Sequence, residues 1–386
     1  MAPRTKKILI ITAWYYPFIH PRAHRWTSLA EYWTARGHIV HVLCSRRFDC
    51  PDEDQLKGVG IHRVGFDSLK EFVYFIFRSK SGRGRVGVAV RKPGLGLRLA
   101  SWLYKTFWAN FYFPDDACLW YFPARKKARA LISEHGFDAV ITVSLPFTGH
   151  LIGLDLKRRF PNLTWLTDIG DPFAAPGQRL NNRHIYGWIN RWLEKKILMR
   201  ADVAAVTTPA LAGLFERLYG PAIRKPQVIP PLFYSPGLPP QPAERPGLDS
   251  SKIHFGYFGA LYKPVRTPDA LLDLLEKTFA QRPDLRGRVQ LHFFGEVFPE
   301  FYNALRKLEY IRLYGLRSRA ETWAAMQQMD FLLHIGNTTT YQLPSKAVDY
   351  LASGKPVVHL SYVRPDPFVD FWGAVPGLLT LNVQHG

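Results

Sequence analysis

The chain has 386 residues, of which 47% are hydrophobic and 14% aromatic, and its formal net charge is +20. This composition excludes an intrinsically disordered chain, and the length favours two domains over a single core. The positive charge favours partners that carry phosphate, such as nucleotides, nucleic acids or anionic lipids, and it does not choose among them.

The N-terminal apolar run, Ile8–Ile11, predicts a buried strand. It is short and is followed by Trp14–Pro17, without the small-residue cleavage site of a signal peptide. No run reaches the roughly 18 apolar residues that a membrane-spanning helix needs. Three cysteines without metal-binding spacing indicate free thiols in a reducing cytosol. They are Cys44, Cys50 and Cys118.

Short apolar runs then alternate with helical patterns, as in parallel sheets with crossover helices. Gly37 is expected to follow the first helix in a left-handed conformation, and Pro123 to occupy the first position of the second. The expected strands are Lys7–Ala13, Ile39–Leu43, Ile61–Val64, Ala139–Val143, Thr164–Leu166 and Val203–Thr207, and the expected helices lie near Arg25–Arg36, Pro123–Glu134, Phe147–Arg159, Tyr186–Met199 and Ala210–Leu218.

Residues 72–122 interrupt this pattern with a basic, glycine-rich part followed by an aromatic part. As an insertion in the first domain, the segment either contacts an anionic membrane surface or packs its aromatic side chains onto that domain. It contains a literal GxGxxG at 82–87, but without the strand–turn–helix context that dinucleotide binding requires.

A proline-rich stretch at 230–250 predicts a connector between a first domain at 1–229 and a second at 251–386. In the second domain, Thr267 and Pro268 are expected as N-cap and first residue of a helix, and Ser318–Glu321 as a capping box. The expected strands are Ile253–Tyr257, Val289–Phe293, Ile311–Leu313, Phe331–His334 and Val357–Leu360. The predicted fold class is α/β, with two doubly wound domains and a ligand cleft between them at the carboxyl ends of the strands.

Three polar residues of the first domain are candidates for catalysis. Asp168 and Asp171 follow a short strand, where a carboxylate can orient a hydroxyl group or act as a base. His150 lies early in the helix after the preceding strand. The alternatives are capping or turn roles for the aspartates and a packing role for the histidine. Asp52–Asp54 is better explained as a solvated acidic turn than as a metal site.

Two loops of the second domain are candidates for contacts with a nucleotide. Lys263 and Arg266 follow a strand that runs into a turn at Gly259, so two cations would meet a diphosphate there. Gly295 and Glu296 end the next strand, where the backbone could approach a base or a sugar. Alternatively, the two cations are solvated charges on the protein surface.

The most informative stretch is 343–358, which combines a helix start, a glycine stop and a buried strand. Ser345 and Lys346 lie at the helix start, and Lys346, Asp349 and Tyr350 are spaced to share one helix face. A helix N-terminus with a lysine suits a diphosphate, and a carboxylate one turn later can bind a ribose diol. The alternative is an exposed ion pair between Lys346 and Asp349.

Taken together, these residues resemble glycosyltransferase family 4, a branch of the GT-B fold. Near the N-terminus, the similarity rests on Trp14–Pro17, Leu29-Ala30 and Arg36–Val42. Further along the first domain, the family pattern pD…W…SxPp…H…DxRDpW is similar to Pro114–Asp116, Trp120, Ser144–Pro146, His150 and Asp168–Pro172. In the second domain, the similar residues are Tyr257–Gly259, Tyr314-Gly315, Asp330 and Pro344–Val358.

The resemblance implies a retaining enzyme that binds a nucleoside-diphosphate sugar in the second domain and the acceptor in the first, without a cofactor or metal ion. Lys346 would lie near the diphosphate, Asp349 would bind the ribose, and Lys263 or Arg266 would neutralise the leaving group. The chain departs from the family pattern where Tyr341 replaces the first acid of E-x7-E. The final helices of the family are expected to be missing.

We therefore expect a cytoplasmic hexosyltransferase that acts on a glycan or lipid-linked acceptor in surface polysaccharide or glycoconjugate synthesis. It is expected either free in the cytoplasm or peripheral on the inner face of the membrane. Two alternatives stay open. A sugar-nucleotide epimerase of the same fold would consume the donor without an acceptor, and a degenerate, membrane-associated partner of a transferase would bind no nucleotide. Nucleic-acid binding is not expected, because no recognisable module carries the positive charge.

Overall fold

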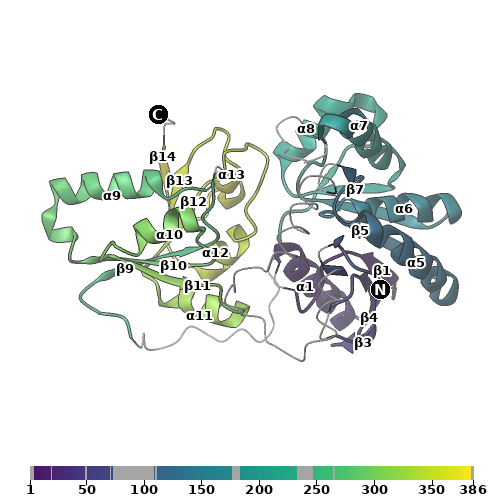
Figure 1. Cartoon of the computed structure of the whole chain (residues 1–386), viewed down its shortest axis with the longest axis horizontal. Helices are drawn as coiled ribbons and strands as arrows, with labels where there is room; N and C mark the ends of the chain where they lie inside the picture. Colours follow the sequence, from purple (N-terminus) through teal and green to yellow (C-terminus); the bar gives the residue numbers. More distant parts are fainter. Residues whose placement is uncertain are drawn as a thin grey trace, which may run out of the picture. The chain divides into compact units, whose positions relative to one another are not determined.

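The structure is a computed structural model that describes residues 4–18, 20–47, 50–69, 71–72, 108, 111–175, 183–232, 247–263 and 266–383. The chain divides into two compact units, Met1–Pro230 and Pro231–Gly386 (Figure 1). Each unit is a sheet of mostly parallel strands covered by helices, which confirms the predicted α/β class with two doubly wound parts.

The described part of the first unit contains an eight-stranded sheet in the order β3-β4-β2-β1-β5-β6-β7-β8. Its strands pair in parallel except β3 with β4. The strands are β1 (Lys7–Ile11), β2 (Ile39–Cys44), β3 (Glu53–Leu56), β4 (Val59–Arg63), β5 (Ala139–Val143), β6 (Thr164–Ile169), β7 (Val203–Val206) and β8 (Gln227–Val228), and the helices are α1 (Pro21–Ala35), η2 (Cys118–Trp120), α5 (Tyr121–His135), α6 (Thr148–Arg159), α7 (Arg183–Arg200), α8 (Pro209–Tyr219) and η3 (Gly220–Ala222).

The second unit has a six-stranded parallel sheet in the order β11-β10-β9-β12-β13-β14. Its strands are β9 (Ile253–Phe258), β10 (Val289–Phe294), β11 (Ile311–Gly315), β12 (Phe331–Ile335), β13 (Val357–Ser361) and β14 (Leu378–Asn382), and its described helices are α9 (Asp269–Gln281), η4 (Pro283–Leu285), α10 (Pro299–Leu305), α11 (Arg319–Gln328), α12 (Ala347–Ser353) and α13 (Pro367–Trp372).

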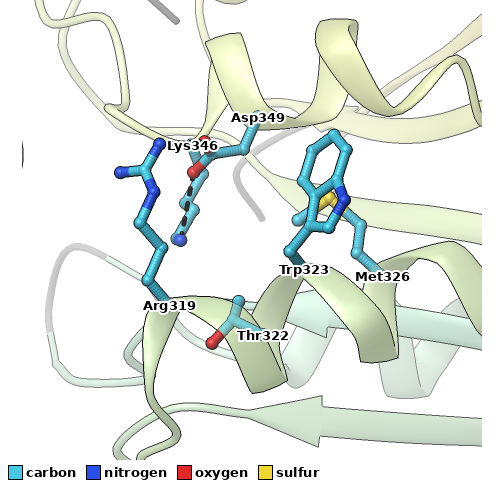
Figure 2. Close-up of a pocket in the computed structure, with 6 residues that line it drawn as sticks. All are labelled: Arg319, Thr322, Trp323, Met326, Lys346 and Asp349. Carbon is cyan, nitrogen blue, oxygen red and sulfur yellow. Dashed lines mark hydrogen bonds and ion pairs between the residues drawn. The ribbon is translucent and has the colours of Figure 1, made fainter. Parts of the chain in front are cut away.

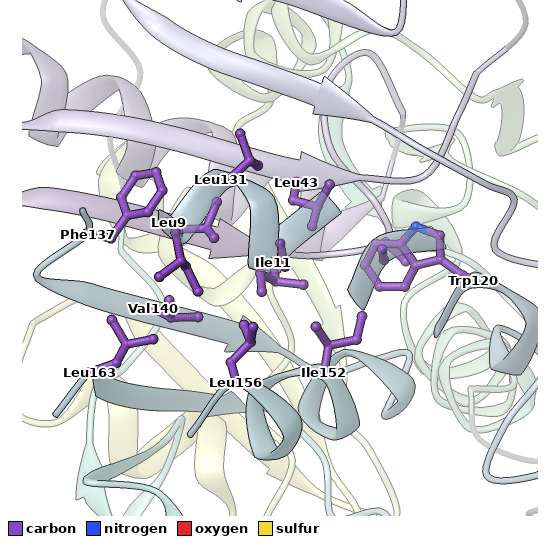
Figure 3. Packing of buried hydrophobic residues seen from close by; sticks show 14 of the residues in the cluster. Leu9, Ile11, Leu43, Trp120, Leu131, Phe137, Val140, Ile152, Leu156 and Leu163 are labelled. Atoms are coloured by element: carbon purple, nitrogen blue, oxygen red, sulfur yellow. The ribbon is translucent and has the colours of Figure 1, made fainter. Parts of the chain in front are cut away.

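The central strand β1 contributes to two hydrophobic clusters of the first unit, one on each face of the sheet, through its alternating side chains. Leu9 and Ile11 pack with α5, α6 and the buried Trp120, whose indole donates to the carbonyl of Val64 at 2.9 Å (Figure 3). Ile10 points to the other face, toward α1. Because successive side chains of a strand alternate in direction, one apolar run fills both sides of the sheet.

Local signals located most elements, with errors at their ends. The capping box of Ser318 and Glu321 and the left-handed Gly37 are confirmed. The first helix begins at Pro21 rather than Arg25, because the side chain of His20 accepts from the backbone of Arg22. The prediction that Pro123 begins a helix is wrong: α5 starts two residues earlier, and a proline is tolerated there because first-turn N–H groups have no partner within the helix.

Two other local predictions are wrong. Helix α9 of the second unit begins at Asp269 with Pro268 as its N-cap, so Thr267 does not cap it. The acidic stretch 52–54 runs into strand β3 instead of forming a turn. Its carboxylates pair with cations: Asp52 with Arg46 at 2.6 Å, Glu53 with Lys127 at 2.6 Å and Asp54 with Arg63 at 3.1 Å.

Several predicted features lie outside the described residues. These are most of the 72–122 insertion with its GxGxxG sequence, and most of the 230–250 connector. All three cysteines are free. No helix within the described ranges is long and apolar enough to cross a membrane.

Buried histidines link neighbouring strands of the second sheet, and they make folding sensitive to acid. His292 on β10 lies 2.9 Å from His254 on β9 and 2.9 Å from the Tyr314 hydroxyl group. Burial, followed by the charge of His254, lowers the pKa of His292 to about 4. The folded state therefore favours the neutral imidazole, and its contribution to stability is present above pH 6.5 and is lost as the pH falls toward 4.

We expect His292→Gln to have a shallower pH dependence of unfolding than the unsubstituted chain. The difference should be about 1.4 kcal/mol for each pH unit below 6.5, since one fewer proton is taken up on unfolding. Urea unfolding at several pH values between 7.5 and 5 measures it, and parallel curves for the two proteins would contradict the assignment.

Candidate functional site

The second unit has a switch point at the centre of its sheet, between β9 and β12. The chain leaves β9 toward β10 and leaves β12 toward β13, so the connections diverge on either side of this pair. In doubly wound sheets, ligands bind at the carboxyl ends of the strands at such a point. The loops after β9 and β12 and the first turns of α11 and α12 all belong to this edge.

Tyr350 of α12 holds this edge together. Its hydroxyl group accepts from the backbone N–H of Phe258 at 3.0 Å and donates to the carbonyl of Leu333 at 2.9 Å, so one side chain joins β9 and β12. The ring is buried, and burial raises the pKa of the phenol. Of the three residues predicted to share a helix face, Tyr350 thus enters the core, while Lys346 and Asp349 stay partly exposed.

Lys346 and Asp349 form a cluster with Arg319 of α11 (Figure 2). The Lys346 ammonium lies 3.1 Å from one carboxylate oxygen of Asp349, and an Arg319 nitrogen lies 3.7 Å from the other. A shallow pocket opens here, with Trp323 and Met326 as its apolar wall and Thr322 beside them. Two cations around one carboxylate leave one net positive charge beside an apolar surface, which suits an anionic ligand with an aromatic or sugar part.

Arg266 lies at the switch point itself. Its Nε donates to Asn337 Oδ1 at 3.0 Å, so the loop after β9 is tied to the loop after β12. Lys263 has different surroundings: its ammonium lies 5.6 Å from the centre of the Phe301 ring on α10. The structure therefore gives the two predicted cations separate partners, and Arg266 is the one at the β9–β12 pair.

The glycines at the strand ends allow two loops to approach closely. Gly295 has a φ of +134°, and a Cβ there would lie 2.1 Å from the carbonyl oxygen of Gly259. The neighbouring Leu261 N–H donates to the carbonyl of Glu296 at 2.9 Å. What the structure establishes for Gly259, Gly295 and Glu296 is packing between loops, and contacts of these residues with a ligand stay a prediction. Ser345 is exposed directly before Lys346.

In the first unit, Asp168 is buried among three donors from α1. Its carboxylate lies 3.3 Å from Arg22, 3.4 Å from Arg25 and 3.0 Å from the indole nitrogen of Trp26. Arg25 also donates to the carbonyl of Pro230 at 3.0 Å, which joins α1 to the end of β8. Asp168 is 1% exposed, so its observed role is to hold two arginines at the carboxyl edge of this sheet.

Arg22 occupies space that only a glycine at position 170 leaves open. A Cβ at Gly170 would lie 1.0 Å from Arg22 Nη2. The motif that Asp168–Pro172 resembles has an arginine at this position. Here the guanidinium comes from α1 instead, with its side chain 13% exposed. The arrangement keeps a cation over the end of β6.

His150 is fully buried with one ring nitrogen unsatisfied. The Trp165 indole donates to Thr142 Oγ1 at 2.9 Å, and this hydroxyl group lies 2.8 Å from His150 Nδ1. The hydroxyl can donate to Nδ1, which leaves the proton of the neutral imidazole on Nε2. Nε2 has no hydrogen-bond partner among the described residues. Burial lowers the pKa of His150 to about 3, so the ring is neutral at pH 7.

Asp171 follows β6 and is partly exposed, three residues beyond the buried Asp168. Catalytic roles for Asp168, Asp171 and His150 stay predictions. Sequence reasoning missed Arg22 and Arg25, because their partner Asp168 lies more than 140 residues further along the chain. It also missed the contribution of Arg319, although the capping box that places this residue at the start of α11 was recognised.

Among the described residues, no cluster of histidine, cysteine and acidic side chains could hold a metal ion.

Comparisons with known proteins identify relatives of this arrangement. A model of the glycosyl transferase 4-like domain matches residues 23–231. Sucrose-phosphate synthase from Thermosynechococcus elongatus superposes with a TM-score of 0.64 at 15% identity, over 98% of this chain and 86% of that one. WaaG, a glycosyltransferase involved in lipopolysaccharide biosynthesis, superposes with a TM-score of 0.57 at 14% identity, over 97% of this chain and 86% of that one.

Trehalose 6-phosphate synthase from Burkholderia multivorans gives a TM-score of 0.58 at 12% identity, with 98% of this chain and 87% of that one covered. The chain has no significant sequence match among curated proteins.

Proposed function

The chain belongs to the glycosyl transferase 4-like family and is a glycosyltransferase of the GT-B fold, and from this premise we propose that it transfers a sugar with retention of configuration from a nucleoside-diphosphate sugar. The donor binds the second unit and the acceptor binds the first. The observation that carries this proposal is the cluster of Lys346, Asp349 and Arg319 at the edge of the second sheet.

Charge stabilisation is the main catalytic task in this proposal. As the sugar leaves, the diphosphate gains negative charge, and cations already in position stabilise it without reorganisation. Lys346 and Arg266 supply that charge, while Asp349 accepts hydrogen bonds from the ribose hydroxyl groups. The departing phosphate oxygen takes the proton of the acceptor hydroxyl group, so no enzyme nucleophile is required. Lys263, Gly259, Gly295, Glu296 and Ser345 line the donor in this proposal.

The first unit contributes an orienting donor and a cation. The neutral imidazole of His150 presents its Nε2–H as a hydrogen-bond donor to a sugar oxygen, and Arg22 lies at the same edge of the sheet. Asp168 positions Arg22, and Asp171, the more exposed acid, contacts the acceptor. A glycan or lipid-linked acceptor in surface polysaccharide synthesis, used on the cytoplasmic side, is motivated by the basic and aromatic sequence of residues 72–122.

Gly170→Ala tests the position of Arg22. The new Cβ would collide only with the guanidinium at the end of a flexible side chain, so we expect the guanidinium to move away from Asp168 while Arg25 and Trp26 stay as donors to that carboxylate and the chain still folds. Turnover should fall by about tenfold or more, as when a hydrogen bond to a charged group is lost. Arg22→Ala should have the same effect, and the double variant should be no worse than either single variant.

Gly213→Ala is the matched control for Gly170→Ala. Its Cβ would lie at 3.4 Å from Arg217, which is an ordinary contact. It should leave turnover unchanged. Additive losses in the Gly170 and Arg22 variants would contradict a shared cause.

A screen for ligand-induced stabilisation tests the donor proposal directly. The folded chain is heated with UDP, GDP, ADP and their sugars, and a ligand at about 100 times its dissociation constant adds about 2.7 kcal/mol of stability. We expect one base to stabilise the chain and the others not. Product analysis with that donor separates transfer, which needs an acceptor, from epimerisation, which does not. No stabilisation by any nucleotide would refute the proposal.

A further inference from the structure

Helix α7 of the first unit has apolar side chains on two opposite faces. Its inner face is buried through Leu193, Ile197 and Leu198, beside α6. Its outer face is also apolar: Ile185 is 44% exposed, Trp188 74%, Trp192 54% and Met199 47%. These four residues follow one another at offsets of three, seven and fourteen from the first, so they form one stripe along the helix.

The charges around this stripe have one sign. Helix α7 carries five lysines and arginines, and its single acid is Glu194. Glu194 is buried, where it accepts from the Tyr219 hydroxyl group at 2.6 Å and from the backbone N–H of Ala174 at 3.3 Å. Arg191 and Arg200 are exposed as the tryptophans are, and Lys196 lies 4.2 Å from the centre of the Trp192 ring. The outer face therefore combines exposed indoles with positively charged side chains.

A further exposed apolar side chain, Phe111, lies near the start of α7. The Tyr186 hydroxyl group donates to the carbonyl of Phe111 at 3.4 Å, and the Tyr186 and Phe113 ring centres are 5.2 Å apart. Phe111 is itself 59% exposed. An exposed patch of this kind marks an interaction site more often than an ordinary solvated surface.

We propose that the outer face of α7, formed by Ile185, Trp188, Trp192, Lys196 and Met199, docks on an anionic phospholipid surface. Indole rings prefer the boundary between headgroups and acyl chains, and lysine and arginine are attracted to anionic headgroups. Charge complementarity favours this partner over a second copy of the chain, which would bring cations against cations. The helix lies in the plane of the interface and does not cross the membrane.

This inference goes beyond the transfer reaction and makes a separate prediction, since vesicle binding needs neither donor nor acceptor. The full chain is mixed with vesicles of phosphatidylcholine, with or without phosphatidylglycerol, and separated by flotation. We expect binding only to the anionic vesicles, weakened by salt. Trp188→Ser/Trp192→Ser should lower the partition constant at least tenfold, and Lys195→Gln/Lys196→Gln should lower it mainly at low salt.

The matched control is Tyr302→Ser/Leu316→Ser, which removes two exposed apolar side chains of the second unit, 45% and 65% exposed. It should bind as the unsubstituted chain does. A second measurement, quenching of tryptophan fluorescence by brominated lipid, should be strong in the unsubstituted chain and reduced in Trp188→Phe/Trp192→Phe. Equal binding by the serine double variant, or equal binding to neutral vesicles, would overturn the proposal. Self-association through this face without lipid binding would overturn it in favour of a second copy.

Discussion

Lys346→Ala is expected to lower turnover by about 100-fold or more and to weaken donor binding. Loss of one preorganised donor at a developing charge costs this much in other enzymes. The substitution removes the cation 3.1 Å from one carboxylate oxygen of Asp349 and leaves Arg319, 3.7 Å from the other, as the cation beside that carboxylate in the pocket. With Lys346 gone, less positive charge is available to stabilise both the donor diphosphate and the Asp349 carboxylate. Steady-state kinetics and nucleotide titration on the purified chain measure both effects.

Lys277→Ala is the matched control for Lys346→Ala. Lys277 also belongs to the second unit and lies 2.7 Å from a carboxylate on its own helix, Asp273, but this pair is exposed on α9. It should leave donor binding and turnover unchanged. If both lysine variants behave alike, the ion pair of Lys346 and Asp349 has no special role in donor binding.

Asp168→Asn is expected to destabilise the first unit by about 3–5 kcal/mol, the cost of removing one member of a buried ion pair. The amide would leave Arg22 and Arg25, whose side chains are 13% and 10% exposed, without a counter-charge. The nearest backbone acceptor of Arg25, the carbonyl of Pro230, carries no net charge. The loss of stability is measured by unfolding the full chain in urea and monitoring a signal that comes from the first unit.

The control for Asp168→Asn is Asp284→Asn, which breaks a bidentate pair with Arg282 at the surface of the second unit. Because solvent screens this exposed pair, its loss should change the stability far less than the loss of the buried pair at Asp168. A small effect at Asp168 would show that its arginines are solvated in solution. A large loss of activity without a loss of stability would instead support direct participation of Asp168 in catalysis.

The two active-site predictions differ in how far local sequence could support them. Lys346 and Asp349 are three residues apart, and a helix start brings such residues together whatever the rest of the chain does. Asp168 was predicted as a catalytic acid on the same kind of reasoning, from its place after a strand. Its three donors come from α1, more than 140 residues earlier, and no local pattern could identify them.

The sequence by itself determined most of the strands and helices in their order, the two doubly wound sheets and the family, but not the strands β3, β8 and β14 at the edges of the sheets. These depend on hydrophobic periodicity, caps and short motifs, which act over a few residues. Only the tertiary structure decided that Asp168 is buried, that Arg22 fills the space above Gly170, that Arg319 joins Lys346, and that the tryptophans of α7 face outward. Each of these depends on contacts between distant segments or on which helix face the core covers, and the folded chain alone sets both.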